Sequence, residues 1–189
     1  CSNTSEVFTQ VITIEDKTAP TWTTAATALN TTIECSNTEA LATAQAQFPV
    51  AADNCDADVT NIVKNAGQFV ANSDCANSGS YTNTWTVTDA CSNTSEVFTQ
   101  VITIEDKTAP TWTTAATALN TTIECSNTEA LATAQSKFPV ASDNCDSDVT
   151  NIVKNAGQFV ANEGCANSGS YTNTWTVTDR SEERRVGKE

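Results

Sequence analysis

Hydrophobic and polar residues alternate strictly in the segment GSYTNTWTVTDAC, residues 79–91. Tyr81, Asn83, Trp85 and Val87 occupy one set of positions, and serine or threonine occupies the positions between them. A period of two residues predicts a β-strand with one buried face and one solvated face. We therefore expect Trp85 to lie in a core.

Two further segments have strand-like patterns. VFTQVITIED, residues 7–16, places Phe8, Ile12 and Ile14 on one face. DVTNIVKNAGQFV, residues 58–70, predicts a β-hairpin that turns at Asn65 to Gly67. Threonine and valine dominate these segments, as a pleated surface favours.

One segment has a helical pattern instead. In SNTEALATAQAQFP, residues 36–49, Ser36 and Glu39 match a capping box. Leu41, Ala44 and Phe48 then fall on one helical face, and Pro49 ends the helix. The pattern as a whole predicts an all-β fold, a β-sandwich with one short helix.

The chain repeats itself with a period of ninety residues. The segment CSNTSEVFTQVITIEDKTAPTWTTAATALNTTIECSNTEALATAQ begins at Cys1 and is repeated without change from Cys91. The two copies can be aligned beyond this segment, and over the whole aligned stretch only six positions differ. Ninety residues are too many for a solenoid unit and enough for a domain that folds alone. We expect tandem β-sandwich repeats.

The repeat frame does not coincide with the first residue. Proline fixes φ and biases the residue before it to extended conformations, so we place the domain junction at residues 106–110 and its copy at 16–20. Residues 1–17 are then the C-terminal strand of a preceding repeat, 18–107 a complete repeat, and 108–179 a repeat that lacks its final strand. We expect the chain to be a fragment of a longer reading frame.

The last ten residues, RSEERRVGKE at 180–189, contain every arginine of the chain. One interpretation is a cationic arm that binds an anionic partner. The other is a translated sequencing adapter, because the decapeptide matches the reading AGA TCG GAA GAG CGT CGT GTA GGG AAA GAG residue for residue. We interpret it as a non-native, adapter-derived tail and exclude it from the fold.

Without this tail, five lysines face twenty carboxylates. Nucleic-acid binding needs clustered Lys and Arg on the protein surface, and anionic lipid surfaces attract basic segments. The composition therefore argues against nucleic acid and membrane insertion as interactions of this chain.

Four cysteines recur in each repeat at spacings of twenty, twenty and sixteen residues: Cys35, Cys55, Cys75 and Cys91 in the complete repeat, with Cys125, Cys145, Cys165 and Cys1 in the partial ones. Zinc sites favour close C-x-x-C pairs, so these spacings indicate disulfides and an oxidising compartment. Three connectivities are possible. We favour Cys35 with Cys75 and Cys55 with Cys91.

These cysteines and the residues around them carry a resemblance. TIEC, DNC, TWTVTDACSN and TQVITIEDKTAPTW are similar to the immunoglobulin-like, hyalin-repeat-like modules arrayed in very large secreted surface proteins of flavobacteria and their relatives. The resemblance implies β-sandwich repeats of an extracellular adhesin or stalk, at the cell surface, with no catalytic residues. It also implies that the partners are neighbouring repeats, and that surface glycans or other cells are contacted through other domains.

Three function classes compete. An enzyme is disfavoured because the chain has no histidine, the commonest general base. Calcium is a possible cofactor: Asp53, Asp56, Asp58 and Asp89 offer hard oxygen ligands, and so do Glu15, Asp16, Glu105 and Asp106 at the junctions. These acids also serve as turn caps in the simpler interpretation.

Sugar binding would need an exposed aromatic platform, for which Trp22 and Trp112 are candidates. The alternatives to the favoured structural spacer are therefore a carbohydrate-binding or a calcium-dependent adhesive module.

Overall fold

The computed structural model describes residues 1–73, 75–147 and 149–178. The predicted adapter-derived tail, residues 180–189, lies outside the described residues. Within them the chain is mostly β, with two eight-residue helices. The predicted all-β class is confirmed.

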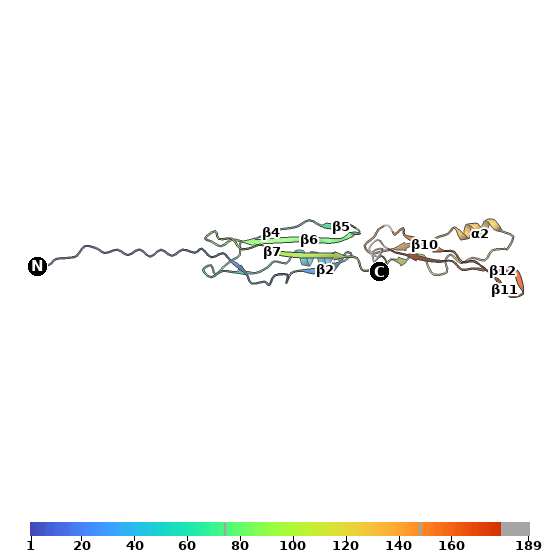
Figure 1. The fold of residues 1–189 in the computed structure, drawn as a ribbon, viewed down its shortest axis with the longest axis horizontal. Helices are drawn as coiled ribbons and strands as arrows, with labels where there is room; N and C mark the ends of the chain where they lie inside the picture. The colour runs from blue at the N-terminus through green and yellow to red at the C-terminus, as the bar shows by residue number, and fades with distance from the viewer. Residues whose placement is uncertain (74, 148, 179–189) are drawn as a thin grey trace, which may run out of the picture. The chain divides into compact units, whose positions relative to one another are not determined.

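In the first copy the elements are β1 Thr21–Trp22, β2 Thr31–Glu34, α1 Thr38–Gln45, β3 Ala51–Ala52, β4 Ile62–Asn65, β5 Val70–Asn72, β6 Cys75–Val87 and β7 Phe98–Glu105. A five-stranded sheet has the order β2-β7-β6-β4, and β5 also pairs with β6 (Figure 1). The β2–β7 pair is parallel and places Ile33 beside Ile104. The β4–β6 pair is antiparallel.

In the second copy the elements are β8 Thr111–Trp112, α2 Thr128–Gln135, β9 Ala141–Ser142, β10 Ile152–Asn155, β11 Phe159–Asn162, β12 Cys165–Tyr171 and β13 Thr174–Val177. The ladders β8–β9, β10–β13 and β11–β12 repeat those of the first copy ninety positions earlier. Two differences stand out. Residues 121–124, the copy of β2, form no strand, and β12 and β13 are separated where β6 is continuous.

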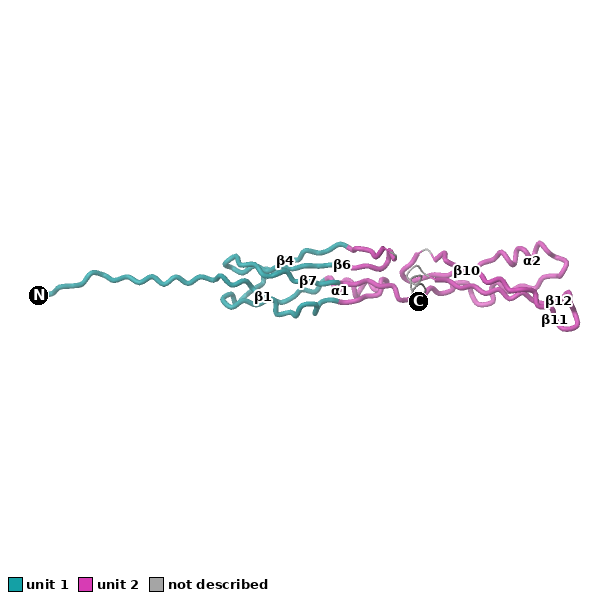
Figure 2. Tube along the Cα trace, in the orientation of Figure 1, with its two compact units in different colours: residues 1–30, 46–68, 82–101 teal, residues 31–45, 69–81, 102–189 magenta. Residues whose placement is uncertain are grey.

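The chain divides into two compact units, coloured in Figure 2: residues 1–30, 46–68 and 82–101, and residues 31–45, 69–81 and 102–189. These units differ from the predicted repeat frame, which remains a prediction.

The core of the first unit is aromatic. Trp85, on β6, is 1% exposed, as its alternation predicted. Phe98 packs edge-on against it with ring centroids 6.0 Å apart, and Phe48 and Trp22 contact this pair at 6.1 and 5.5 Å. Because Trp22 lies on β1 and Phe48 lies three positions before β3, the small β1–β3 ladder packs against the aromatic face of β6 and β7.

The core of the second unit is aliphatic. Ile33 from β2, Ala44 from α1, and Ile102 and Ile104 from β7 form one buried cluster. Leu41 packs against it from the helix. Ala44 and Leu41 therefore lie on the buried helical face that the sequence predicted, whereas Phe48 lies beyond the end of the helix at Gln45.

The predicted capping residue is wrong by one position. Asn37, not Ser36, caps α1, because its Oδ1 accepts a hydrogen bond from Ala40 N at 3.0 Å. Asn127 does the same for Ala130 in α2. Asparagine caps helices as well as serine does, so the helix begins after the asparagine.

The predicted hairpin at Asn65 to Gly67 is also wrong. β4 and β5 do not pair with each other. Both pair with β6, one after the other along its length, and the register shifts by one residue between the two pairings. At this shift Gly67 N donates to Asn83 Oδ1 at 3.1 Å, and a Cβ on Gly67 would lie 2.1 Å from Thr82 O. The glycine marks an interruption where the backbones approach closely, rather than a turn.

Candidate functional site

A disulfide and a set of carboxylates meet at the end of β2. Cys35 directly follows β2 and bonds to Cys145 of the second copy, with their α-carbons 5.9 Å apart. The two cysteines are 110 residues apart in the sequence. The bond therefore joins consecutive copies of the repeat.

The loop that carries Cys145 is shaped by its own aspartate. Asp143 Oδ1 accepts hydrogen bonds from Cys145 N at 2.8 Å and from Asp146 N at 3.1 Å. In the first copy, Asp53 holds the DNC loop around Cys55 with the same two bonds. These are Asx turns, in which a short carboxylate replaces a backbone acceptor.

Glu34 connects this loop to β2. Its carboxylate accepts hydrogen bonds from Asn144 Nδ2 at 3.1 Å and from the Thr108 hydroxyl at 3.2 Å. Asn144 Nδ2 also donates to the hydroxyl of Ser36 at 2.8 Å. We call Glu34, Cys35, Asn144 and Cys145 the latch, because their contacts hold the two copies together at this point.

The latch explains why the cysteine pairing differs from the predicted Cys35–Cys75. Glu34 and Ser36 flank Cys35 and hold Asn144, which places Cys145 within bonding distance. Cys75 remains a half-buried thiol and lies 3.3 Å from the Ser78 hydroxyl.

The remaining described cysteines are exposed thiols in the structure: Cys1, Cys55, Cys91, Cys125 and Cys165. Cys55 and Cys91 are separate thiols in the structure, but they lie close enough for Cys91 to influence Cys55, so the favoured Cys55–Cys91 pair remains a prediction. Partial desolvation raises the pKa of the Cys55 thiol, and Asp16, Asp53 and Cys91 add to the effect. Desolvation and the carboxylates of Asp16 and Asp89 likewise raise the pKa of Cys91.

The four predicted calcium ligands are only partly brought together. Two clusters of described residues have ligand atoms within 4.8 Å of one another: Asp16, Asp53 and Cys55, and Glu34, Cys35, Asp106 and Cys145. Of Asp53, Asp56, Asp58 and Asp89, only Asp53 belongs to either cluster, whereas the junction candidates Asp16 and Asp106 each belong to one. Asp56 accepts from Ala90 N at 3.3 Å, and Asp58 N donates to Asp56.

Asp89 is occupied as a turn cap. Its carboxylate accepts two hydrogen bonds of 2.8 Å from Asn93, one from the backbone N and one from Nδ2. Burial alone would raise the pKa of Asp89, but the hydrogen bonds from Asn93 outweigh it and lower the pKa from its ordinary value.

The junction acids are placed differently from one another. Asp106 joins the cluster around Glu34, whereas Glu105 forms an ion pair with Lys107. Asp16 joins Asp53, and Glu15 pairs with Lys17. One acid at each junction is thus engaged by a lysine and the other faces a cysteine.

The tryptophan candidates for sugar binding serve packing in the first copy. Trp22 Nε1 donates to Glu96 O at 2.7 Å and its ring contacts Phe98. Trp112, its copy, is 41% exposed.

Sequence reasoning missed two polar elements. Nothing in the sequence around Glu34 marks it as a functional residue, apart from its position next to Cys35. Gln100 carried a usable signal, because it occupies an inward position between Phe98 and Ile102 in the strand. Its buried amide accepts from Asn83 Nδ2 at 3.0 Å and donates to Leu29 O at 2.8 Å.

In the described part of the chain, every helix is too short and too polar to cross a membrane. Comparison with known proteins finds no match among curated proteins or solved structures. Among family models, the HYR-like domain with 4 cysteines matches residues 23–104. This stretch includes the segment from β2 to α1, the DNC loop and most of β7, and it supports a hyalin-repeat-like module in the first copy.

Proposed function

We propose that the chain is part of an extracellular, non-enzymatic array of repeats that holds a distal binding region away from a cell surface. The HYR-like match at residues 23–104 supports an adhesion-type module. The near-identical second copy supports an array, because a spacer gains length from each added repeat whereas catalysis gains little from sites in series.

The observation that carries the proposal is the Cys35–Cys145 bond between consecutive copies. A tensile load transmitted through this bond bypasses the residues between the two cysteines, including the junction at 106–110. Closing a loop of this length also removes entropy from the unfolded chain, worth about 5 kcal/mol in the chain-entropy model. Both effects suit a part that is pulled rather than one that catalyses.

The surface chemistry agrees with this role. The acids of the DNC loop shape turns through Asp53 and Asp143 instead of facing each other across a cleft. The excess of carboxylates makes neighbouring copies repel one another, which opposes the misassembly to which identical tandem domains are prone.

Force spectroscopy on the full chain tests the proposal. When the ends are pulled without reductant, the segment between Cys35 and Cys145, which are 110 positions apart, stays locked. At about 3.3–3.6 Å per residue, reduction should add about 360–400 Å to the contour length. Cys35→Ser should release the same length without reductant, and Cys75→Ser should not. Equal contour lengths with and without reductant would contradict a disulfide that carries the force.

Calcium-dependent adhesion is the second candidate function. It is favoured by Asp53, whose Oδ2 is buried and accepts no hydrogen bond from the described residues, and which lies beside Asp16 and Cys55. Millimolar Ca²⁺ should then raise the melting temperature of the full chain, and Asp53→Asn should reduce that rise. An unchanged melting temperature would exclude a native-state site of useful affinity.

A further inference from the structure

Four side chains with metal-binding atoms converge at the latch. The ligand atoms of Glu34, Cys35, Asp106 and Cys145 lie within 4.8 Å of one another. Two of these atoms are sulfurs from consecutive copies of the repeat. The other two are carboxylate oxygens, one at the end of β2 and one directly after β7. We call these four residues the ligand cluster.

The spacing within the ligand cluster matches a tetrahedral zinc site. Glu34 Oε1 lies 3.7 Å from Cys35 Sγ and 3.5 Å from Cys145 Sγ. Zinc bonds of about 2.3 Å to sulfur and about 2.0 Å to oxygen place these two ligand atoms about 3.5 Å apart on a tetrahedron. Calcium and magnesium take oxygen ligands, whereas thiolates favour zinc. Two sulfurs and two oxygens therefore suit one zinc ion.

Both carboxylates of the ligand cluster are oriented by hydrogen bonds. Glu34 accepts from Asn144 Nδ2 at 3.1 Å and from the Thr108 hydroxyl at 3.2 Å. Asp106 accepts from Thr108 N at 3.3 Å. A cavity of about 270 Å³ borders three of the four ligands, Glu34, Cys35 and Cys145. Oriented ligands and a path of entry are what a metal site needs besides its ligand atoms.

The approach of a junction aspartate to the cysteine of a DNC loop does not depend on the disulfide. Asp16 and Cys55 occupy the positions of Asp106 and Cys145 in the first copy, and they also cluster, together with Asp53. Cys55 is a thiol there. The fold therefore brings carboxylate and sulfur together whether or not the sulfur is oxidised.

We propose that the ligand cluster binds one zinc ion when the Cys35–Cys145 bond is reduced, and that this ion replaces the disulfide as the link between the copies. A dithiol supplies two electrons and two protons to the two sulfurs, and is itself oxidised to a disulfide. Zinc then displaces both thiol protons to solvent and binds the thiolates and the two carboxylates. In zinc-free buffer the reduced latch is open. The inference rests on the geometry of the latch and not on the proposed spacer role.

A metal titration of the full 189-residue chain tests the proposal. Serine replaces the six other cysteines, so that only the latch supplies thiolates: Cys1, Cys55, Cys75, Cys91, Cys125 and Cys165. The chain is reduced, and the reductant is removed without air. Co²⁺ should then produce thiolate-to-cobalt charge-transfer absorption that saturates at one ion per chain, and Zn²⁺ should abolish it by displacement. The oxidised chain should give no such absorption, because its sulfurs are bonded to each other.

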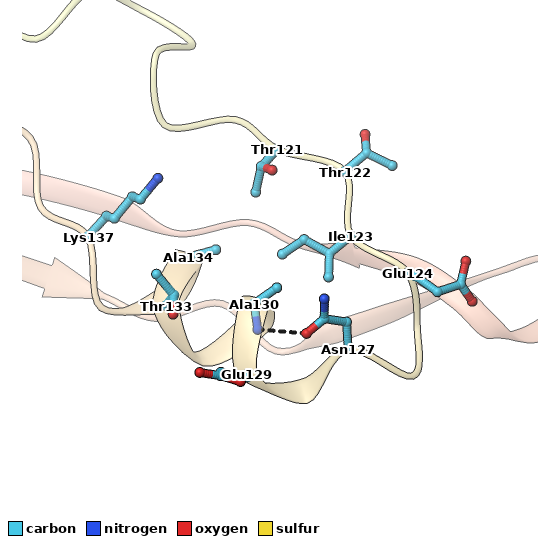
Figure 3. A pocket seen from close by; sticks show the side chains of 10 residues that line it. All are labelled: Thr121, Thr122, Ile123, Glu124, Asn127, Glu129, Ala130, Thr133, Ala134 and Lys137. Carbon is cyan, nitrogen blue, oxygen red and sulfur yellow. Dashed lines mark hydrogen bonds between the residues drawn. The ribbon is translucent and has the colours of Figure 1, made fainter.

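Three substitutions in this six-serine chain separate the ligand cluster from general acidity. Asn144→Ala keeps all four ligands but removes a hydrogen bond to Glu34, so zinc affinity should fall about 10–100-fold. Glu34→Gln removes a ligand and should weaken zinc binding further. Glu124→Gln is the matched control, because Glu124 is the exposed copy of Glu34 and its carboxylate points away from the α2 side chains (Figure 3). Equal effects of Glu34→Gln and Glu124→Gln would overturn the proposal.

Alkylation of the reduced wild-type chain gives a readout that does not need the six serines. Zn²⁺ should slow alkylation of Cys35 and Cys145 together and leave the rate at Cys75 unchanged. Tryptic peptides 18–64 and 138–154, with fragment ions to locate the label, report the two latch cysteines. Protection of neither would overturn zinc binding, and protection of only one would overturn the zinc link between the copies.

Discussion

Asn83 and Gln100 form a buried amide pair, in which Asn83 Nδ2 donates to Gln100 Oε1 at 3.0 Å. The pair continues at both ends, because Gly67 N donates to Asn83 and Gln100 Nε2 donates to Leu29 O. These two side chains thereby connect the central strands β6 and β7 to the loop at Leu29 and to the interruption between β4 and β5. Both side chains are completely buried.

Removing one partner of this pair should be costly. Gln100→Ala removes the hydrogen bond that the buried amide of Asn83 makes with Gln100 and the one that the part-buried carbonyl of Leu29 accepts from it, so we expect a loss of about 1–3 kcal/mol in the free energy of unfolding. Thr99→Ala, on the exposed face of the same strand, should change it by less than about 0.5 kcal/mol. Urea denaturation followed by tryptophan fluorescence measures both. Equal effects would show that the amide pair contributes nothing specific.

The two copies of FTQVITIE allow one substitution to be compared in two environments. Ile102→Ala should cost about 2–5 kcal/mol, because Ile102 is fully buried and the change leaves a cavity. Ile12→Ala changes the same sequence context where the side chain is exposed, and should cost less than about 0.5 kcal/mol. The comparison is made by chemical denaturation at low protein concentration. A large effect of Ile12→Ala there would mean that residues 8–15 are packed within the monomer.

Gly67 should not tolerate a side chain. A Cβ there would lie 2.1 Å from Thr82 O, a backbone atom that cannot move away without breaking the sheet. We expect Gly67→Ala to cost about 1–3 kcal/mol or more through overpacking. Ala66→Ser at the exposed neighbouring position serves as control, and melting temperatures compare the two. A neutral Gly67→Ala would contradict the close approach of the two backbones.

Asp89 should contribute a pH dependence at the acid end. Although burial opposes the shift, hydrogen bonds from Asn93 stabilise the carboxylate and lower the pKa of Asp89 from its ordinary value in the folded protein. A depressed folded pKa contributes stability above the unfolded pKa, and this contribution is lost as the pH falls through the folded value. Carboxyl NMR titration should therefore show a lower midpoint for Asp89 than for an ordinary aspartate, and Asn93→Ala should raise it. A midpoint unchanged by that substitution would assign the shift to another cause.

Much of the β structure could be predicted from local patterns. The alternation around Trp85 predicted the buried face of β6, because side chains in a strand alternate irrespective of the partner. The helix could likewise be predicted from a local pattern, although Asn37 rather than Ser36 caps it. Where the outcome depended on pairing between distant segments, local patterns failed. Gly67 resembles a turn residue in the sequence, and only the register of β4 and β5 against β6 shows that it marks an interruption.

The candidate site was less predictable for the same reason. Cysteine spacing indicates disulfides but does not determine connectivity. The Cys35–Cys145 pair depends on Glu34 and Ser36 meeting Asn144 from the next copy, a relationship between residues 110 and 108 positions apart. Predictions made within one repeat could not include it.

The joining of consecutive copies by a disulfide is tested most directly by a tryptic map of the non-reduced chain. Cleavage after lysine places Cys35 in peptide 18–64, Cys75 in peptide 65–107 and Cys145 in peptide 138–154. With Cys55→Ser, which removes the second cysteine of peptide 18–64, the chain should yield 18–64 linked to 138–154. A link from 18–64 to 65–107 would instead assign Cys35 to a partner within its own repeat, and would contradict the covalent joining of the copies.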